Sequence, residues 1–223
     1  MSRHLVRKLE ELDRSLGALA TAVAHGVTVA LDAYFAGDEA AARRVIEDEV
    51  HVDRMEIDLE EACLLALALE QPVAADLRLV VAVLKINSDL ERIGDLAVSV
   101  AEETVSLADR AHRVEPPMDL STITRQVRWV LAESLQALVR RDEERAERVR
   151  IAEGEIEEAT RSAQERLRSW MIERPEAVPR GLSILRVLRD LERIAAHAVN
   201  IAEDVLYLTR GEIQRHSRPP MLQ

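Results

Sequence analysis

Cysteine, aromatic residues and long apolar runs are scarce in this chain of 223 residues, and each scarcity excludes a class of protein. The single cysteine, Cys63, cannot form an intramolecular disulfide. Aromatic residues make up 2% of the chain and β-branched runs are few, which disfavours a β-sheet protein. No apolar run approaches the roughly 20 residues that span a bilayer, and the N-terminus lacks the apolar core of a signal peptide. We therefore expect a cytoplasmic protein.

Basic charge is also in deficit, because 30 Lys and Arg stand against 41 Asp and Glu, for a formal net charge of −11. This sign disfavours binding to nucleic acid, whose phosphate backbone attracts basic proteins. The surplus acid is local. Residues 1–115 hold 12 basic and 23 acidic residues, whereas residues 116–223 hold 18 of each. The position of the acids in the first half is therefore informative.

Familiar catalytic signatures are absent from the sequence. There is no Gly-rich phosphate loop, no GxSxG motif and no CxxC pair. None of His51, His112 and His197 lies three residues after a glutamate, as the Glu-x-x-His motif of ferritin-like di-iron proteins requires. A carboxylate-bridged metal enzyme is thus an alternative that is supported only by the acidic residues of the chain.

Long segments free of proline predict an all-α protein. A proline inside a helix costs about 3 kcal/mol, so the prolines mark helix ends. Asp38 and Asp142 are good N-caps for two of the helices. The predicted helices cover residues 3–36, 38–70, 73–112, 119–141, 142–173 and 178–210.

An internal duplication organises these six helices. DLERIGDLAVSVAE (89–102) and DLERIAAHAVNIAE (190–203) share nine of fourteen residues at an offset of 101. Upstream, 37–53 aligns with 141–157 at an offset of 104, and both segments carry apolar residues seven apart, as in Val45, Val52 and Leu59. We predict two tandem three-helix bundles, 1–115 and 116–211, followed by a tail, 212–223.

Two rows of carboxylates in the first half do not follow the pattern of an ordinary solvated surface. Glu91, Asp95 and Glu102 interrupt an apolar row of the third helix, whereas Lys85, Asp89 and Glu103 fall on its remaining, solvent-facing arc. The second helix carries a single acidic stripe of Glu49, Asp53, Glu56 and Glu60. Like charges four residues apart repel each other, so something must compensate for them.

A multivalent cation is the compensation that we favour over an arginine partner or a partly hydrated surface. If the two rows face each other, Glu49-x-x-x-Asp53 and Glu91-x-x-x-Asp95 form a cage of four carboxylates. Oxygen ligands of this kind suit Fe, Mn or Mg better than structural zinc. His51 lies two residues from each acid of its motif and is expected to point away, into solvent.

The repeated DLER motifs, the preceding QPVAADLR (71–78), the duplicated three-helix unit and the length together resemble the PhoU family of phosphate-transport regulators. The resemblance implies metal clusters held by E/DxxxD motifs and a cytoplasmic protein that is often a homodimer. It also implies a non-enzymatic role in negative control of phosphate uptake and of the phosphate-starvation regulon. The implied partners are the ATPase of a phosphate ABC transporter and a sensor histidine kinase, with membrane contact only through these proteins.

Carried over by position, the family's metal motif matches Glu49, Asp53, Glu91 and Asp95 in the first repeat. In the second repeat it matches Glu153, Glu157 and Glu192, but Ala196 stands where the motif has an aspartate. A methyl group cannot bind a metal, so the second site is empty, weaker or completed by His197, Asn200 or Glu203. A purely structural helical adaptor of a phosphate permease, without metal, is therefore a further alternative.

Overall fold

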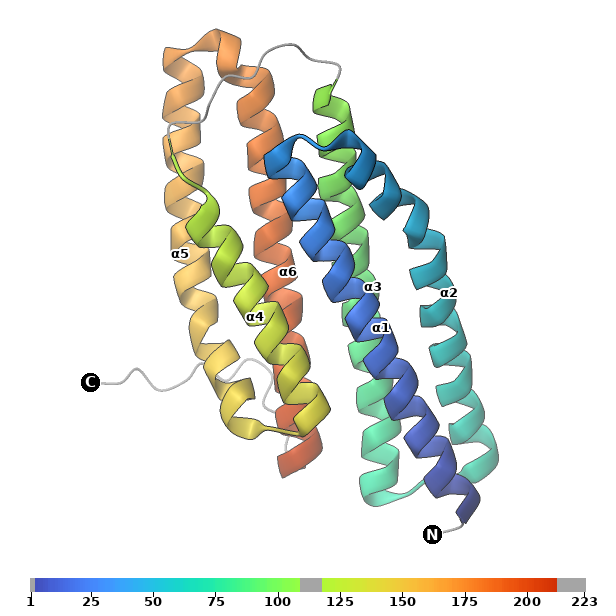
Figure 1. Ribbon diagram of the computed structural model, residues 1–223. Coiled ribbons are helices and arrows are strands. Elements are labelled where there is room, and N and C mark those ends of the chain that lie inside the picture. The colour runs from blue at the N-terminus through green and yellow to red at the C-terminus, as the bar shows by residue number, and fades with distance from the viewer. Residues whose placement is uncertain (1–2, 109–117, 212–223) are drawn as a thin grey trace, which may run out of the picture.

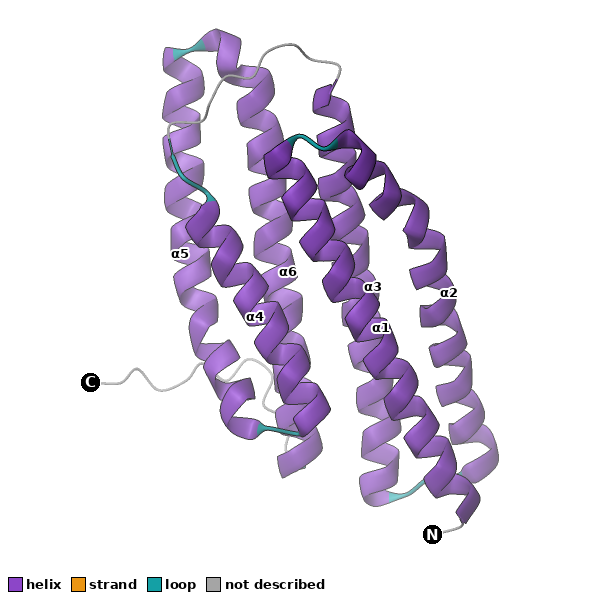
Figure 2. Ribbon diagram, in the orientation of Figure 1, coloured by secondary structure: helices purple, strands orange, loops and turns teal. Residues whose placement is uncertain are grey.

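The protein is a six-helix structure, and the computed structural model describes residues 3–108 and 118–211 (Figure 1). The described residues form helices and connections and no strand (Figure 2). The helices are α1 (Arg3–Ala36), α2 (Glu39–Glu70), α3 (Ala74–Ala108), α4 (Ser121–Arg140), α5 (Glu143–Glu173) and α6 (Val178–Arg210), with a short 3₁₀ turn (Pro175–Ala177) before α6.

The helix boundaries agree with the predicted ones within a few residues. Asp38 caps α2 by accepting a hydrogen bond from the backbone N of Ala41 at 2.9 Å. Asp142 caps α5 in the same way, accepting from the backbone N of Arg145 at 3.0 Å. The end of the third predicted helix, the boundary between residues 115 and 116, and the predicted tail lie outside the described residues.

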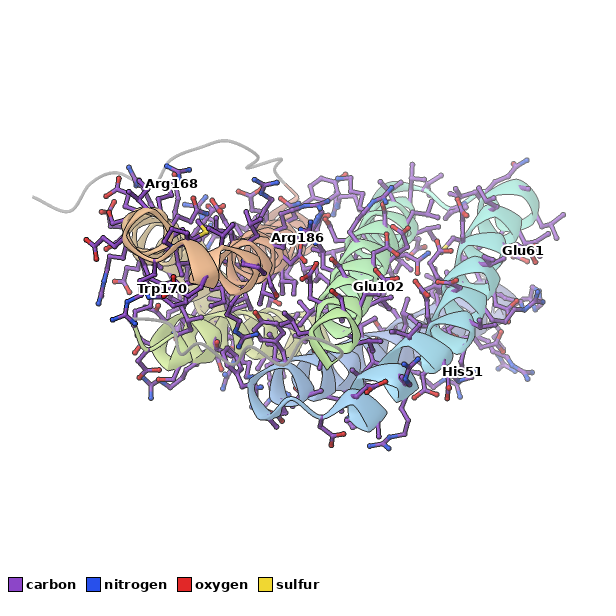
Figure 3. All side chains as sticks on the ribbon, turned by 90° about the horizontal axis from the view of Figure 1, so that it is seen from above. His51, Glu61, Glu102, Arg168, Trp170 and Arg186 are labelled. Carbon is purple, nitrogen blue, oxygen red and sulfur yellow. The ribbon has the colours of Figure 1, made fainter. Side chains whose placement is uncertain are left out.

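The two three-helix bundles lie side by side. Each helix of the first repeat contacts the other two, as does each helix of the second, and α3 packs along α6 between the bundles. Viewed down the helices, α2, α3, α6 and α5 form one layer, and α1 and α4 lie on one side of it (Figure 3). The prediction of two tandem three-helix bundles is confirmed, and α3 and α6 form the centre of the molecule.

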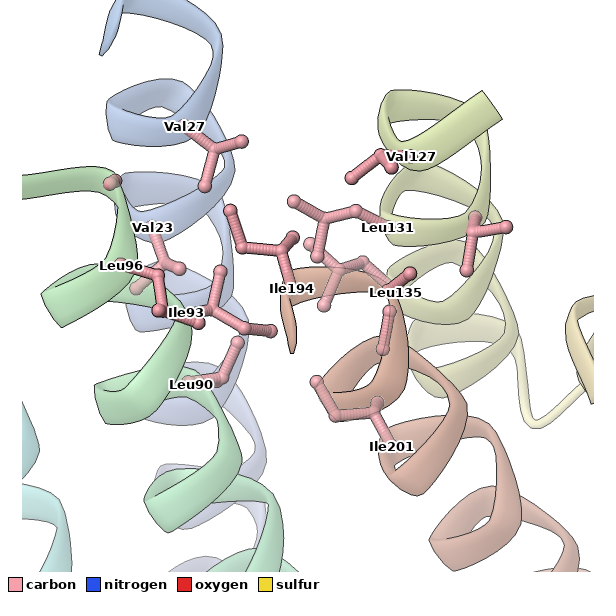
Figure 4. Packing of buried hydrophobic residues seen from close by; sticks show 14 of the residues in the cluster. Val23, Val27, Leu90, Ile93, Leu96, Val127, Leu131, Leu135, Ile194 and Ile201 are labelled. Carbon is pink, nitrogen blue, oxygen red and sulfur yellow. The ribbon is translucent and has the colours of Figure 1, made fainter. Parts of the chain in front are cut away.

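One continuous apolar core joins the bundles. Close-packed side chains from α1, α3, α4 and α6 meet at the centre, among them Val23, Ile93, Leu131 and Ile194 (Figure 4). Helix α1 is long and apolar enough to cross a membrane by length and composition alone, contrary to the expectation from the sequence. In this fold its leucines and valines line the core, as an internal helix of a bundle does.

The α3/α6 interface includes Lys85, Asp89 and Glu103, so the assignment of these three charged residues of α3 to solvent was wrong. Lys85 of α3 donates to Asp204 of α6 at 3.2 Å, and Arg186 of α6 donates to Glu103 of α3 at 2.6 Å. Asp89 is 9% exposed and accepts from the amide of Asn200. These residues face the second repeat, and a single helix pattern cannot distinguish a neighbouring helix from water.

The interface contacts are related by the duplication. At the offset of 101, Lys85 corresponds to Arg186 and Glu103 to Asp204, so each repeat supplies the base for the other's acid. The hydrogen bond of Asn200 to Asp89 has its counterpart in the bond that Ser99 donates to Asp190 at 2.8 Å. The two repeats therefore pack through antiparallel α3 and α6 about an approximate two-fold axis.

Candidate metal centre

The facing sides of α2 and α3 carry seven carboxylates, which we call the first acidic face: Glu49, Asp53, Glu56 and Glu60 of α2, and Glu91, Asp95 and Glu102 of α3. Positions 49, 53, 56 and 60 lie on one stripe of α2, because three or four residues advance an α-helix by about one turn. Glu49, Glu56 and Glu91 are half-buried, and the other four residues are exposed.

Electrostatic contacts across the helix pair confirm that the two acidic rows face each other. Burial raises the pKa of Glu49, and the charges of Asp53, Asp95 and Glu102 raise it further. Burial also raises the pKa of Glu91, with added repulsion from Asp95 and from Asp53 on α2. Two of the repelling groups for Glu49 belong to the opposite helix. The first acidic face is thus a region of concentrated negative charge shared by two helices.

Glu56 is fixed in the same region by a residue that the sequence analysis missed. Burial raises the pKa of Glu56, as do Glu60, Glu91 and Asp53. Asn87 of α3 donates its side-chain amide to Oε1 of Glu56 at 2.9 Å and to its backbone oxygen at 3.1 Å. A buried asparagine one helical turn before Glu91 was the available signal, because buried amides require partners.

Among the described residues, Arg92 is the basic side chain that forms ion pairs with this face. Its guanidinium lies 3.3 Å from Glu91 and 3.4 Å from Asp95, at an exposed position. One exposed arginine compensates little of the repulsion among seven carboxylates, because exposed ion pairs contribute about 0–1 kcal/mol. The face therefore retains a large unneutralised negative charge.

The donor set of this face fits a hard cation. Carboxylate oxygens are preferred by Mg and Mn and also bind Fe, and bridging carboxylates hold two ions about 3.5–4 Å apart in multinuclear sites. As the side chains stand, no three His, Cys, Asp or Glu residues within 3–108 and 118–211 converge as a metal-holding group. The face presents candidate ligands, and enclosing an ion would require rotation of Glu and Asp side chains.

The second repeat carries a reduced version of this face. Glu153 and Glu157 occupy the positions of Glu49 and Asp53, and Glu192 that of Glu91, whereas Ala196 is exposed where Asp95 stands. Partial desolvation and the charge of Glu157 raise the pKa of Glu153, whereas Arg150 lowers it. Two further acids are replaced at equivalent positions, by Thr160 for Glu56 and by Gln164 for Glu60. Three of the seven carboxylates are therefore missing.

Two of the residues considered as substitutes for the missing ligand have other partners. His197 Nδ1 lies 2.8 Å from Oδ1 of Asp89, and Asn200 donates to the same oxygen at 3.0 Å. Both side chains thus point toward α3 and belong to the interface between the repeats. In the first repeat, His51 is exposed, as predicted (Figure 3).

Comparison with known proteins gives consistent results. The model of the PhoU domain family matches residues 16–104 and again residues 120–205, one match in each repeat. The phosphate-specific transport system accessory protein PhoU homolog of Pseudomonas aeruginosa is 35% identical over 97% of this chain and 89% of its own length. PhoU of Escherichia coli K12, also named a phosphate-specific transport system accessory protein, is 30% identical over 94% of this chain and 86% of its own length.

Solved structures show the same architecture. The crystal structure of PhoU from Pseudomonas aeruginosa superimposes with a TM-score of 0.89, covering 92% of this chain and 99% of that one. The structure of the phosphate transport system regulatory protein PhoU from Streptococcus pneumoniae gives 0.84 at 26% identity, covering 94% of this chain and 98% of that one. From the two domain matches, these identities and the shared fold, we conclude that this chain belongs to the PhoU family.

Proposed function

We propose that this protein is a non-enzymatic regulator of phosphate uptake that binds multivalent cations on its first acidic face. The observation that carries the proposal is the concentration of seven carboxylates on α2 and α3, opposed by little positive charge. The process, phosphate transport, is inferred from relatives named as accessory proteins of a phosphate-specific transport system.

Glu49, Asp53, Glu91 and Asp95 are the proposed first ligands, with Glu56, Glu60 and Glu102 within the same charged region. A bound Fe, Mn or Mg ion would supply positive charge that neutralises the repulsion between α2 and α3. The second repeat, through Glu153, Glu157 and Glu192, is proposed to bind cations more weakly because it lacks three of the seven acids.

The proposed partners are the ATPase of a phosphate ABC transporter and a phosphate-sensing histidine kinase, with a second copy of this chain forming a homodimer. Their support is the family membership and the names of the relatives. Through such contacts a cytoplasmic protein would restrain both uptake and the phosphate-starvation regulon. The alternative, a metal-free helical adaptor of a phosphate permease, needs neither these acids nor a bound cation.

A genetic experiment tests this proposal. We expect deletion of the gene to raise phosphate-starvation gene expression in phosphate-rich medium, and the wild-type gene to restore repression. The Glu91→Ala/Asp95→Ala variant is expected to restore it poorly, whereas Glu158→Ala, which removes an exposed partner of Arg161, restores it fully. A deletion without effect would contradict the regulatory role, and full rescue by the double variant would favour the metal-free adaptor.

A further inference from the structure

A buried amide beside the first acidic face has an oxygen that is left without a partner. Asn87 of α3 is 2% exposed, and its amide nitrogen donates to the backbone oxygen and to Oε1 of Glu56. The backbone oxygen and the carboxylate of Glu56 are acceptors, so the nitrogen of Asn87 must face them. Its Oδ1 then has no hydrogen-bond partner among the described residues. A buried acceptor without a partner costs free energy, and native proteins keep few of them, so this oxygen is available to a ligand.

The unpartnered oxygen lies among carboxylates of two helices that pack side by side (Figure 1). Asn87 precedes Glu91 by four residues, so the two side chains are neighbours on one face of α3. The oxygen and nitrogen of an amide share one carbon, which places Oδ1 of Asn87 about 5 Å or less from Oε1 of Glu56 on α2. Glu56 touches the buried amide and is itself only half-buried, so a small cation can approach the amide along its carboxylate.

Glu56 and Glu49 lie in different parts of the first acidic face. Burial raises the pKa of Glu56, and Glu91 is one of the acids whose charge raises it further. Burial also raises the pKa of Glu49, but its acidic neighbours on α3 include Glu102 and not Glu91. Asn87, Glu56 and Glu91 therefore form a group of their own, which we call the Asn87 group.

The second repeat has lost both members of the hydrogen-bonded pair. At the offset of 101, the position of Asn87 is occupied by Leu188, and at the offset of 104, that of Glu56 is occupied by Thr160. Leu188 is fully buried, so the equivalent helix pair packs with an apolar side chain at this position. The fold therefore does not require the amide. Asparagine and glutamate occur together in the repeat that carries all seven carboxylates.

We propose that Asn87 supplies a neutral oxygen ligand, through Oδ1, to a cation held with Glu56 and Glu91. This proposal rests on the cation binding of the proposed function and adds a ligand that the E/DxxxD motif does not contain. Amide and carboxylate oxygens together suit Mg²⁺, Mn²⁺ or Ca²⁺ better than metals that prefer nitrogen or sulfur ligands. The hydrogen bond between Asn87 and Glu56 also holds two of the ligands in place before an ion binds.

A Mn²⁺ titration of the full chain, with the free ion measured by its EPR spectrum, tests the proposal. We expect Asn87→Leu to raise the dissociation constant for Mn²⁺ about 10-fold or more, because the ion loses one ligand and the positioning of another. The second repeat carries leucine at this position, so the variant should fold. Asn200→Leu makes the same change at the other asparagine of the chain, which donates to Asp89, and should leave the dissociation constant unchanged.

Asn87→Asp distinguishes an oxygen ligand from a hydrogen-bond donor. A carboxylate at position 87 keeps an oxygen for the cation and adds charge, but it cannot donate to Glu56 and repels it. We therefore expect this variant to unfold at a lower temperature than the wild type in EDTA and to bind Mn²⁺ at least as tightly. If Asn87 only held Glu56 in place, Asn87→Asp would bind Mn²⁺ as poorly as Asn87→Leu.

Equal Mn²⁺ affinity of the wild type and Asn87→Leu would overturn the proposal and leave cation binding by the first acidic face intact. Poor binding by Asn87→Asp, or an equal loss in Asn200→Leu, would overturn the role of Asn87 as a ligand. A wild type that binds no Mn²⁺ would overturn both this proposal and the cation binding of the proposed function. Failure of the ligand and failure of the proposed function are therefore distinguishable.

Discussion

At the scale of single residues, three acids of the first acidic face, Glu49, Glu56 and Glu91, are half-buried among like charges. Glu49 shows the cost most clearly, because burial and three neighbouring acids raise its pKa together. Such a group destabilises the fold while it is ionised and unpaired. In the proposed metal-bound state the same group becomes favourable, so we expect its contribution to stability to depend on metal.

Replacing Glu49 with glutamine is expected to have opposite consequences with and without metal. In EDTA, Glu49→Gln should raise the free energy of unfolding by about 0.5 kcal/mol, because it removes like-charge repulsion. In millimolar Mn²⁺, the wild type should gain stability and the variant should gain less. Urea unfolding in both conditions measures the difference. Glu158→Gln is the control, and an equal response of wild type and Glu49→Gln to Mn²⁺ would contradict a ligand role.

The two charge pairs between the repeats differ in how deeply they are buried. The side chains of Lys85 and Asp204 are 29% and 3% exposed, whereas those of Arg186 and Glu103 in the equivalent pair are 67% and 12% exposed. Lys85→Met should therefore lower the free energy of unfolding by about 2 kcal/mol, because it removes a base that pairs with a buried carboxylate. Arg186→Met should cost about 1 kcal/mol or less. Equal losses in denaturant unfolding would show that burial does not distinguish the pairs.

At the scale of helices, the caps account for where α2 and α5 begin. Asp142 marks the start of α5 where α4 and α5 are joined without proline or glycine. Asp142→Ala should lower the free energy of unfolding by about 1 kcal/mol, and Asp142→Asn should lower it much less, because asparagine still accepts the capping bond. Asp38→Ala at the equivalent cap of α2 should match Asp142→Ala. Thermal unfolding that is unchanged by both alanine variants would contradict this account.

Most of the fold was predictable because helical periodicity and the duplication are properties of the sequence itself. The six helices and their grouping follow from proline-free segments, Asp caps and an offset repeat. Helical periodicity could not show which polar arc of a helix faces another helix and which faces water. Asp89 and Glu103 follow the same pattern as solvent-facing residues, yet they face α6. The partner of His197 depended on the packing of the two bundles, which no local pattern encodes.

The arrangement of the two acidic rows was predictable to a similar degree. The acidic rows of α2 and α3 were identified by spacing, and the structure places them opposite each other. Asn87 was missed because its role depends on contact with Glu56 across the helix pair. The sequence motif already shows that Ala196 lacks the carboxylate of Asp95. Thr160 and Gln164, which stand at the positions of Glu56 and Glu60, lie outside that motif, so their loss of charge was not predicted.

At the scale of the whole molecule, the two repeats share one architecture and differ in charge. The net charge of −11 arises in the first repeat, where all seven acids of the face are present. The second repeat keeps four of these positions acidic, and residues 116–223 are neutral overall. Duplication followed by divergence thus leaves one face with seven carboxylates and a counterpart with four, joined through the packing of α3 against α6.

The central claim, that the first acidic face binds multivalent cations more tightly than its counterpart, is tested most directly by elemental analysis. Wild type, Glu91→Ala/Asp95→Ala and Glu192→Ala would be loaded with Mn²⁺, desalted and measured for bound metal per chain. We predict that the first variant loses most of the metal and that Glu192→Ala retains most of it. Equal metal content in all three proteins, or a loss confined to Glu192→Ala, would contradict the claim.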